Sequence, residues 1–254
     1  MESVAAMITI NGARISAMPS AEGFTPSALQ REIFDIMSAS RENYSYDSEH
    51  VLITELKVRD SIVNASHDLA RSGLSFKIFR DSKANPEFWN RTSEGGFELK
   101  AGVSPSDAIA DIYARGSLYG TECSTAMIIV LYKALLDVMP RDEYGRLFSS
   151  IYLMNWQHLD RDLALVTDRD PVDEIPGDAR YFSNPDVDPL RPEWQGENAY
   201  YLGGGLYYGH GIGIRNAGEM IRALNRARKK DATRSAYLNE MVKRQDYGQL
   251  AKYM

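Results

Sequence analysis

One long apolar run constrains how this 254-residue chain can fold. It extends from Ala126 to Met139, it contains only two charged residues, Lys133 and Asp137, and Pro140 follows it. A helix built from such a sequence carries apolar side chains all around its axis, which is typical of a helix buried on every face. We therefore predict a central buried helix that ends before Pro140 and around which the other elements pack.

The only cysteine of the chain, Cys123, stands just before this run. We expect Thr121, or Gly120 before it, to cap the helix, which places Cys123 in the first helical turn. Unpaired N–H groups and the helix dipole favour negative charge there, so we expect a lowered thiol pKa and a reactive thiolate. The same N–H groups can hold the oxyanion of an acyl-transfer intermediate. A buried cysteine that acts only as a small apolar side chain is the alternative, and position alone does not separate the two interpretations.

Composition and charge exclude several classes of protein. The net charge is −6, so a general nucleic-acid binder is not expected, and we interpret the basic residues between Arg226 and Arg234 as a solvated helix end. No apolar stretch is long enough to cross a membrane, and the first ten residues do not resemble a secretory signal. A single cysteine forms no internal disulfide, and four scattered histidines give no metal-binding pattern. We expect no metal, no cofactor, no nucleic-acid partner and no membrane.

Periodicity and turn signals predict a mixed α+β fold in a single domain that covers residues 1–254, since neither a repeat nor a linker interrupts the chain. Segments with helical spacing or capping signals are expected to be helices: 27–40, 49–72, 105–115, 141–148, 218–228 and 233–244. Segments rich in β-branched and aromatic residues are expected to be strands: 7–10, 88–92, 97–100, 151–154, 179–182, 198–202 and 206–208. We expect loops at 40–47 and at 155–177.

Two of these strands bring a pair of titratable residues close together. Three glycines, 203–205, join the strands 198–202 and 206–208, with Glu197 entering the first strand and His210 leaving the second. Residues at the open end of a hairpin are neighbours across the ladder, so contact between Glu197 and His210 is compatible with this spacing.

Three segments of the chain form an ordered set: Tyr119–Ala126 around the cysteine, Glu193–Asn198 followed by Leu202-Gly203, and Tyr208–Ile214. Their residues, order and spacing resemble the Bacillus-type spore-coat transglutaminases, which are protein-glutamine gamma-glutamyltransferases. The resemblance starts near residue 7 and covers the rest of the chain, so residues 1–6 are expected to be an N-terminal extension. It implies a papain-like (NlpC/P60-type) core, in which the cysteine begins a buried helix that packs on a small antiparallel sheet, with extra helices around it.

The resemblance also implies roles for individual residues. Cys123 is the nucleophile, Glu197 is the partner of its thiol, and Glu122 is a second acid that substitutes in part for Glu197. His210 corresponds to a histidine near the site. An ordinary glutamate is a poor base for a thiol, so we expect burial and the mutual repulsion of the two acids to raise the pKa of Glu197. Four aromatic residues are expected to wall a narrow substrate tunnel: Phe76, Trp156, Tyr181 and Trp194.

By the same resemblance, Cys123 takes the acyl group of a protein glutamine as a thioester and releases ammonia, and a lysine amine then forms an isopeptide cross-link, without calcium. The implied substrates are glutamine- and lysine-bearing spore coat proteins. The implied location is the cytoplasm of the sporulating mother cell and then the spore coat. Two other functions stay open: a papain-like cysteine peptidase or amidase that acts on cell-wall peptides, and a non-enzymatic coat protein with an inert cysteine. The peptidase would normally use a histidine base, and the two glutamates argue against it.

Overall fold

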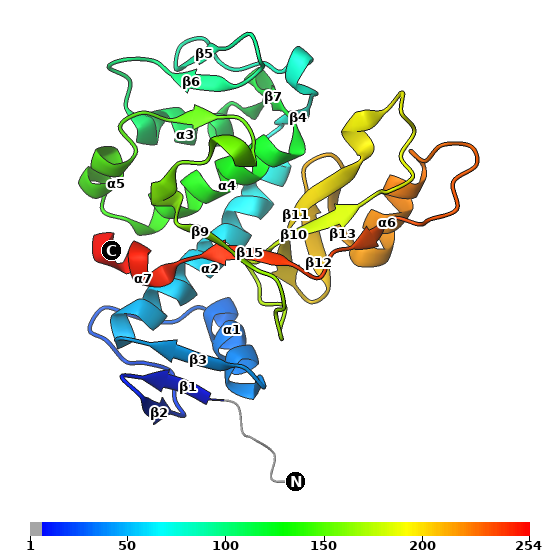
Figure 1. Cartoon of the computed structure of the whole chain (residues 1–254). Coiled ribbons are helices and arrows are strands. Elements are labelled where there is room, and N and C mark those ends of the chain that lie inside the picture. Colours follow the sequence, from blue (N-terminus) through cyan, green and yellow to red (C-terminus); the bar gives the residue numbers. More distant parts are fainter. Residues whose placement is uncertain (1–6) are drawn as a thin grey trace.

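Helix α4, Cys123–Val138, lies at the centre of the computed structural model, which describes residues 7–254 (Figure 1). Its residues from Cys123 to Leu135 are buried apart from Lys133, and the helix ends before Pro140, as the apolar run predicts. Residues 1–6, expected to be an N-terminal extension, lie outside the described residues. The assignment of the whole chain to one domain stays a prediction.

The longest described helix, α2 (Glu49–Arg71), packs along α4 and continues down to the N-terminal sheet (Figure 1). The Ser48 hydroxyl caps it by accepting a hydrogen bond from the Val51 N–H group. Gly73 lies just beyond its end with a φ of +86°, in the left-handed conformation that glycine adopts most easily. The helix predicted at 49–72 is therefore confirmed.

A small N-terminal sheet and helix α1 (Ala28–Ala39) cover the lower end of α2 (Figure 1). The strand order is β2-β1-β3, with these bounds: β1 (Met7–Ile10), β2 (Ala13–Ile15) and β3 (Asn43–Tyr46). The loop predicted at 40–47 is wrong, because β3 lies there and pairs in parallel with β1. In β3, Tyr44 and Tyr46 are buried and their neighbours are exposed, which is the alternation of a half-buried strand.

A larger antiparallel sheet packs against α2 and α4. Its strand order is β13-β12-β11-β10-β15-β9, and β14 pairs with β10. The strands have these bounds: β9 (Leu165–Asp168), β10 (Ala179–Ser183), β11 (Gly196–Gly203), β12 (Leu206–Gly209), β13 (Gly213–Asn216), β14 (Tyr237–Leu238) and β15 (Val242–Gln245). The Tyr200 hydroxyl of β11 donates a hydrogen bond of 3.2 Å to the Met127 carbonyl of α4. The expected α+β arrangement, a buried helix that begins with the cysteine and packs on an antiparallel sheet, is confirmed.

Shorter elements complete the shell around α4 (Figure 1). The remaining strands and helices are β4 (Ser75–Phe76), β5 (Trp89–Arg91), β6 (Phe97–Leu99), α3 (Pro105–Ala114), β7 (Gly120–Thr121), α5 (Arg141–Leu147) and β8 (Tyr152–Leu153). Single 3-10 turns are η1 (Phe79–Asp81), η2 (Gly116–Leu118), η3 (Trp156–His158), η4 (Arg161–Leu163), η5 (Pro192–Trp194) and η6 (Ala251–Tyr253). The parallel pairing of β4 with β7 brings Phe76 alongside Thr121, two residues before the cysteine.

The C-terminal part of the chain departs from the sequence prediction. The helix expected at 218–228 is α6 (Ala217–Asn225), but the helix expected at 233–244 is wrong, because β14 and β15 occupy that segment. The loop expected at 155–177 is also wrong in part, because β9 lies inside it and pairs with β15. Segments far apart in the sequence complete each other's hydrogen bonds there, and such a ladder overrides local preference. The chain then ends in α7 (Tyr247–Leu250) and η6.

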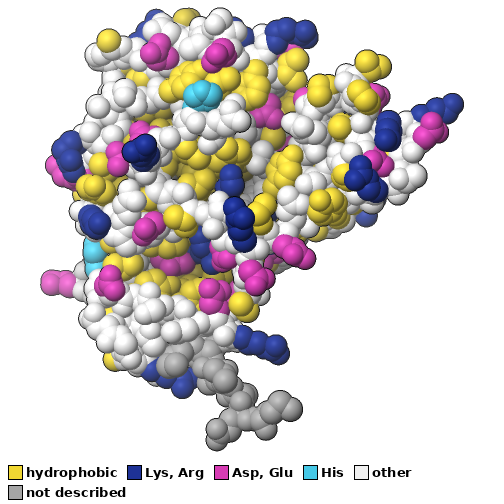
Figure 2. All heavy atoms as spheres, in the orientation of Figure 1, with side chains coloured by type: hydrophobic (Ala, Val, Ile, Leu, Met, Phe, Trp, Pro, Cys, Tyr) yellow, Lys and Arg dark blue, Asp and Glu magenta, His cyan; other side chains and the backbone are white. Residues whose placement is uncertain are grey.

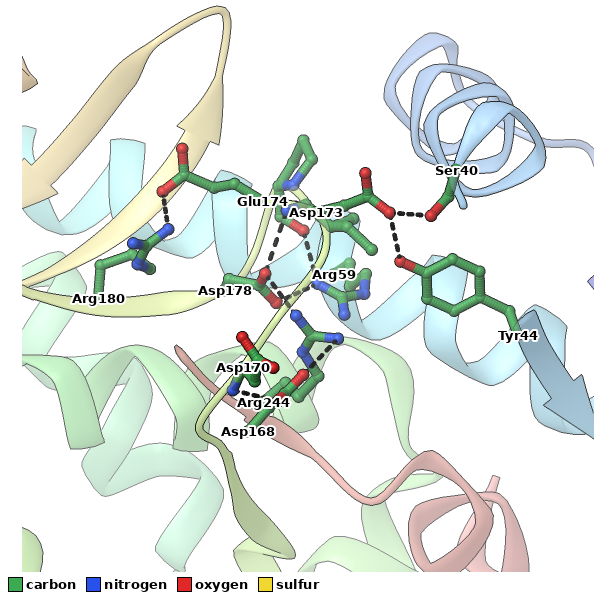
Figure 3. Close-up of polar contacts among 12 residues, drawn as sticks. Ser40, Tyr44, Arg59, Asp168, Asp170, Asp173, Glu174, Asp178, Arg180 and Arg244 are labelled. Atoms are coloured by element: carbon green, nitrogen blue, oxygen red, sulfur yellow. Dashed lines mark hydrogen bonds and ion pairs between the residues drawn. The ribbon is translucent and has the colours of Figure 1, made fainter. Parts of the chain in front are cut away.

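A buried ion network joins α2, the start of β10 and β15 (Figure 3). Arg59 of α2 is fully buried, and its guanidinium group donates to Glu55 Oε1 at 2.7 Å and to Asp178 Oδ1 at 2.8 Å. Arg244 of β15 donates to the other carboxylate oxygen of Asp178 at 3.1 Å. One buried carboxylate therefore links two arginines, and the network fixes β10 and β15 relative to α2.

Replacing Arg59 by methionine leaves two buried carboxylates, Glu55 and Asp178, without its positive charge. We expect Arg59→Met to lower the free energy of unfolding by about 3–5 kcal/mol, the usual cost of removing one partner of a buried ion pair. The matched control, Arg71→Met on the same helix, removes a pair with Asp68 whose side chains are 72% and 55% exposed. It should cost less than about 1 kcal/mol. Urea unfolding followed by circular dichroism measures both, and equal losses would contradict the anchoring role of Arg59.

Candidate active site

Cys123 is the first residue of α4, and only 2% of it is exposed. Glu122 caps the helix, so the cap predicted at Thr121 or Gly120 is wrong, because those two residues form β7. The Glu122 carboxylate accepts hydrogen bonds from the N–H group and the hydroxyl of Ser124, at 2.9 and 2.6 Å. The thiol is therefore in the first turn, as expected, but it stands next to an acidic cap.

Two side chains form hydrogen bonds with the sulfur atom of Cys123. The Cys123 thiol donates a hydrogen bond of 3.1 Å to Glu122 Oε1, and the Asn198 side-chain amide donates one of 3.4 Å to Sγ. Asn198 is held in turn by Trp156, whose indole N–H group donates to Asn198 Oδ1 at 2.9 Å. An acceptor for the thiol proton and a donor to the sulfur thus converge on one atom, which is an arrangement suited to a thiol nucleophile.

The surroundings of Cys123 raise the pKa of its thiol, so the lowered pKa expected at a helix N-terminus is wrong. Burial is the main cause, and the negative charges of Glu197 and Glu122 add to it, while the backbone and side-chain N–H groups of Asn198 oppose it. Desolvation and two carboxylates outweigh the helix dipole. The thiol is consequently protonated at neutral pH, and a base must take its proton during a reaction.

Glu197 lies on β11, and its carboxyl group is buried. Burial, with a smaller contribution from the charge of Glu122, raises the pKa of Glu197 to about 8, against the opposing effect of the Gly211 N–H group, which donates to Oε1 at 3.1 Å. The direction and the causes agree with the expectation from the sequence. Position 209 requires glycine, because a Cβ atom at Gly209 would lie 2.7 Å from this carboxyl group. Glu197 is therefore a neutral acid at neutral pH.

In the part of the chain that the structure describes, His210 forms no hydrogen bond with Glu197. The residue after it, Gly211, donates a backbone hydrogen bond to the Glu197 carboxyl group instead. The His210 Nδ1 atom lies 3.2 Å from the Tyr208 hydroxyl, and its Nε2 atom is buried. The centre of its ring is 6.2 Å from that of Phe76. Burial lowers the pKa of His210 to about 4, so the ring is neutral at neutral pH.

A cleft of about 460 Å³ opens onto the thiol. Of the four aromatic residues expected around the substrate, Trp156 and Tyr181 line this cleft, whereas Phe76 and Trp194 pack on each other at 5.8 Å outside its lining. Lys243 of β15 also lines the cleft, with its Nζ atom 4.5 Å from the centre of the Trp156 ring. Aromatic surface and polar groups at the thiol are a usual composition for a site that binds a small side chain.

Sequence reasoning does not single out two residues of this cleft, Asn198 and Lys243. Asn198 directly follows Glu197 inside one of the three motifs, so its proximity could be found from the sequence, although its bond to the sulfur could not. Lys243 gives no such signal, because its segment is predicted to be a helix. The pairing of β15 with β9 and β10 places it in the cleft.

Two general findings concern the partners that the chain can hold. Among residues 7–254, no group of three or more His, Cys, Asp or Glu side chains is arranged to hold a metal ion, and no described helix is long and apolar enough to cross a membrane. The catalytic roles expected for Cys123, Glu122, Glu197 and His210 stay predictions, while the structure gives their positions.

Comparison with known proteins shows that the chain is similar to enzymes. The model of the protein-glutamine gamma-glutamyltransferase family matches residues 7–254. A protein-glutamine gamma-glutamyltransferase of Bacillus mycoides (strain KBAB4) is 44% identical over 227 residues, which are 89% of this chain and 82% of the relative. One from Bacillus cereus (strain AH820) is 44% identical over 220 residues, 87% of this chain and 79% of the relative. The solved transglutaminase from Geobacillus stearothermophilus, without its C-terminal extension, has a TM-score of 0.78 and 48% identity, and the match covers 81% of this chain and 98% of that chain.

Removing the charge of Glu197 should make the thiol easier to ionise. We expect the pH midpoint for alkylation of Cys123 by iodoacetamide to fall by about one unit in Glu197→Gln, because the thiolate no longer forms beside a second anion. Alkylation rates between about pH 6 and pH 11, followed by mass spectrometry, give the midpoint.

Glu193→Gln is the matched control for this measurement. Glu193 lines the same cleft, but the carboxylates that raise the pKa of the thiol are Glu197 and Glu122, so removal of the Glu193 charge should leave the midpoint in place. An unchanged midpoint in Glu197→Gln, or an equal fall in both variants, would show that the charge of Glu197 does not act on the sulfur.

Proposed function

The chain belongs to the protein-glutamine gamma-glutamyltransferase family, and on that premise we propose that Cys123 takes the acyl group of a protein glutamine and passes it to a lysine amine. The observation that carries this mechanism is the hydrogen bond from the thiol to Glu122, in a site whose second acid, Glu197, is neutral. Glu122 accepts the hydrogen bond from the thiol and Glu197 carries a proton, so the site offers both a proton acceptor and a proton donor at neutral pH. The products are ammonia and an isopeptide cross-link.

In the first half-reaction, Glu122 accepts the thiol proton and the sulfur of Cys123 attacks the carbonyl carbon of the glutamine side chain. The N–H groups at the start of α4 and the Asn198 side-chain amide stabilise the oxyanion that forms. Glu197 then donates its proton to the amide nitrogen, the carbon–nitrogen bond breaks and ammonia leaves. A thioester remains on Cys123, with Glu122 protonated and Glu197 charged.

In the second half-reaction, the neutral amine of a lysine attacks the thioester carbon. Glu197 takes the proton that the amine loses, the carbon–sulfur bond breaks, and Glu122 returns its proton to the sulfur. Both acids are then back in their starting states, so the cycle consumes no proton. Trp156 and Tyr181 limit the space at the thioester, which favours a lysine side chain over water as the attacking group.

This division of roles gives the thiol proton to Glu122, whereas the resemblance to the family names Glu197 as the partner of the thiol. The distance of 3.1 Å from Sγ to Glu122 and the raised pKa of Glu197 support the assignment of Glu122 as the acceptor of the thiol proton. His210, a neutral ring that is not bonded to the thiol in the described chain, is not positioned as the base that a papain-like peptidase requires. The geometry therefore favours acyl transfer over the peptidase alternative.

We also propose that the substrates are spore coat proteins, and that the enzyme works in the cytoplasm of the sporulating mother cell and then in the coat. The support for this setting is the resemblance of the three motifs to the spore-coat enzymes. The net charge of −6 is compatible with an attraction to lysine-rich substrates.

Transfer to an amine tests the activity directly. The purified protein, in chelator, with a glutamine-rich protein and a fluorescent primary amine, should incorporate the amine, and Cys123→Ala should lower the rate by roughly a thousandfold or more. Ammonia release is recorded in parallel. Release without incorporation would indicate a glutamine deamidase, and the absence of both signals from folded protein would contradict the proposed activity.

The pH dependence of ammonia release tests the assignment of the two acids. With a capped glutamine peptide, kcat/KM should fall as the pH rises through about 8, because Glu197 loses the proton that the leaving group needs. Glu197→Gln should be slower by about a hundredfold or more and should lack this descending limb. The measurement is kcat/KM for ammonia release between about pH 6 and pH 10. A value of kcat/KM that rises through about pH 8 would instead indicate that Glu197 is the base.

A further inference from the structure

A second hollow, of about 400 Å³, lies beside α6. Four arginines line it: Arg191, Arg215, Arg222 and Arg226. Its lining contains one acidic residue, Glu219. We name this surface the arginine hollow. Figure 2 shows Lys and Arg side chains, with Asp and Glu side chains between them, on the lobe that contains α6.

The charges of the arginine hollow are not compensated within residues 7–254. None of its four arginines forms an ion pair with a described carboxylate: Arg215 donates to a backbone carbonyl, and Arg191 lies 5.7 Å from the centre of the Trp194 ring. Glu219 is engaged at the start of α6, where its carboxylate accepts a hydrogen bond from the Asn216 N–H group. In a protein of net charge −6, this hollow concentrates positive potential at one place.

The arginine hollow shares a wall with the thiol cleft. Trp194 of η5 lines the hollow, whereas the residues on either side of it, Glu193 and Gln195, line the cleft. Gly211 also lines the hollow, and its N–H group donates the hydrogen bond to Glu197. A polypeptide that occupies the hollow is therefore separated from the reacting groups by the thickness of one loop.

We propose that the arginine hollow binds acidic residues that flank the reactive glutamine, so that the enzyme selects glutamines in acidic segments of its acyl-donor protein. This inference rests on the proposed function. Guanidinium groups match carboxylates in both charge and planar geometry. A lysine-bearing segment carries positive charge, and four arginines would repel it. The occupant that fits is thus the glutamine-bearing chain and not the chain that supplies the amine.

Binding without turnover tests the docking step separately from the chemistry. The probe is a fluorescein-labelled peptide in which one glutamine is flanked by glutamates, titrated into the Cys123→Ala protein and followed by anisotropy. Arg215→Glu combined with Arg222→Glu in that background should raise the Kd by about tenfold or more, and salt should weaken the binding of the parent. Arg215→Gln with Arg222→Gln should act in the same direction.

The matched control makes the same change of charge elsewhere. Lys230→Glu with Lys252→Glu alters two exposed lysines outside the hollow and should change the Kd by less than about twofold. An equal loss of affinity in the control pair would mean that the net charge of the protein, and not the hollow, determines binding, and would overturn the proposal. Unchanged binding in the hollow variants would also overturn it.

Steady-state kinetics on the active enzyme decide which substrate is bound. The variant Arg215→Glu/Arg222→Glu should raise KM for the glutamate-flanked peptide by about tenfold at nearly constant kcat, and should leave KM for a glycine-flanked glutamine peptide and for a small amine unchanged. A rise in KM for the amine instead would overturn the assignment to the acyl donor. If neither peptide yields transfer with the parent enzyme, the proposed function fails, while the binding experiment still decides whether the hollow holds acidic peptides.

Discussion

The candidate active site depends on the burial of the first turn of α4. Burying this apolar helix stabilises the fold, and Cys123 is carried into the interior with it. The start of a buried helix leaves N–H groups that need acceptors. Glu122 meets this need through one carboxylate oxygen, which accepts from Ser124, and holds the thiol through the other. The side chain that caps the helix is thus also the group that accepts the hydrogen bond from the Cys123 thiol.

Burial also gives the two glutamates of the site, Glu122 and Glu197, different surroundings. Glu122 accepts hydrogen bonds from the Cys123 thiol and from two groups of Ser124. Glu197 has the Gly211 N–H group as its bonded donor and lies in surroundings that raise its pKa to about 8. The site therefore resembles an acid–base pair more than two interchangeable glutamates. Because the thiol pKa is itself raised, an acid and a base are both needed, and a helix dipole alone would not activate the sulfur.

Much of the site could be predicted from local sequence, because local signals place it. The apolar run predicts α4, and capping residues predict α2 and α3. The motifs indicate Cys123, Glu122 and Glu197 as candidate site residues. The errors concern features that depend on partners distant in sequence. The pairing of β9 with β15 has no local signature, and the helix expected at 233–244 is wrong for that reason. The lowered thiol pKa is wrong because desolvation depends on the surrounding fold, which the position of a cysteine within its helix does not specify.

The strand that the sequence misassigns is also the one that links stability to chemistry. Neighbouring residues of a strand point to opposite faces, so on β15 Lys243 reaches the thiol cleft while Arg244 points into the buried ion network with Asp178 and Arg59 (Figure 3). Lys243 lies over Trp156, which holds the Asn198 amide that donates to the sulfur. A chain of contacts thus runs from a fully buried arginine on α2 to the Cys123 sulfur. Arg59, Asp178 and Arg244 support the strand that carries Lys243 to the cleft, and motifs that contain only residues at the thiol cannot reveal them.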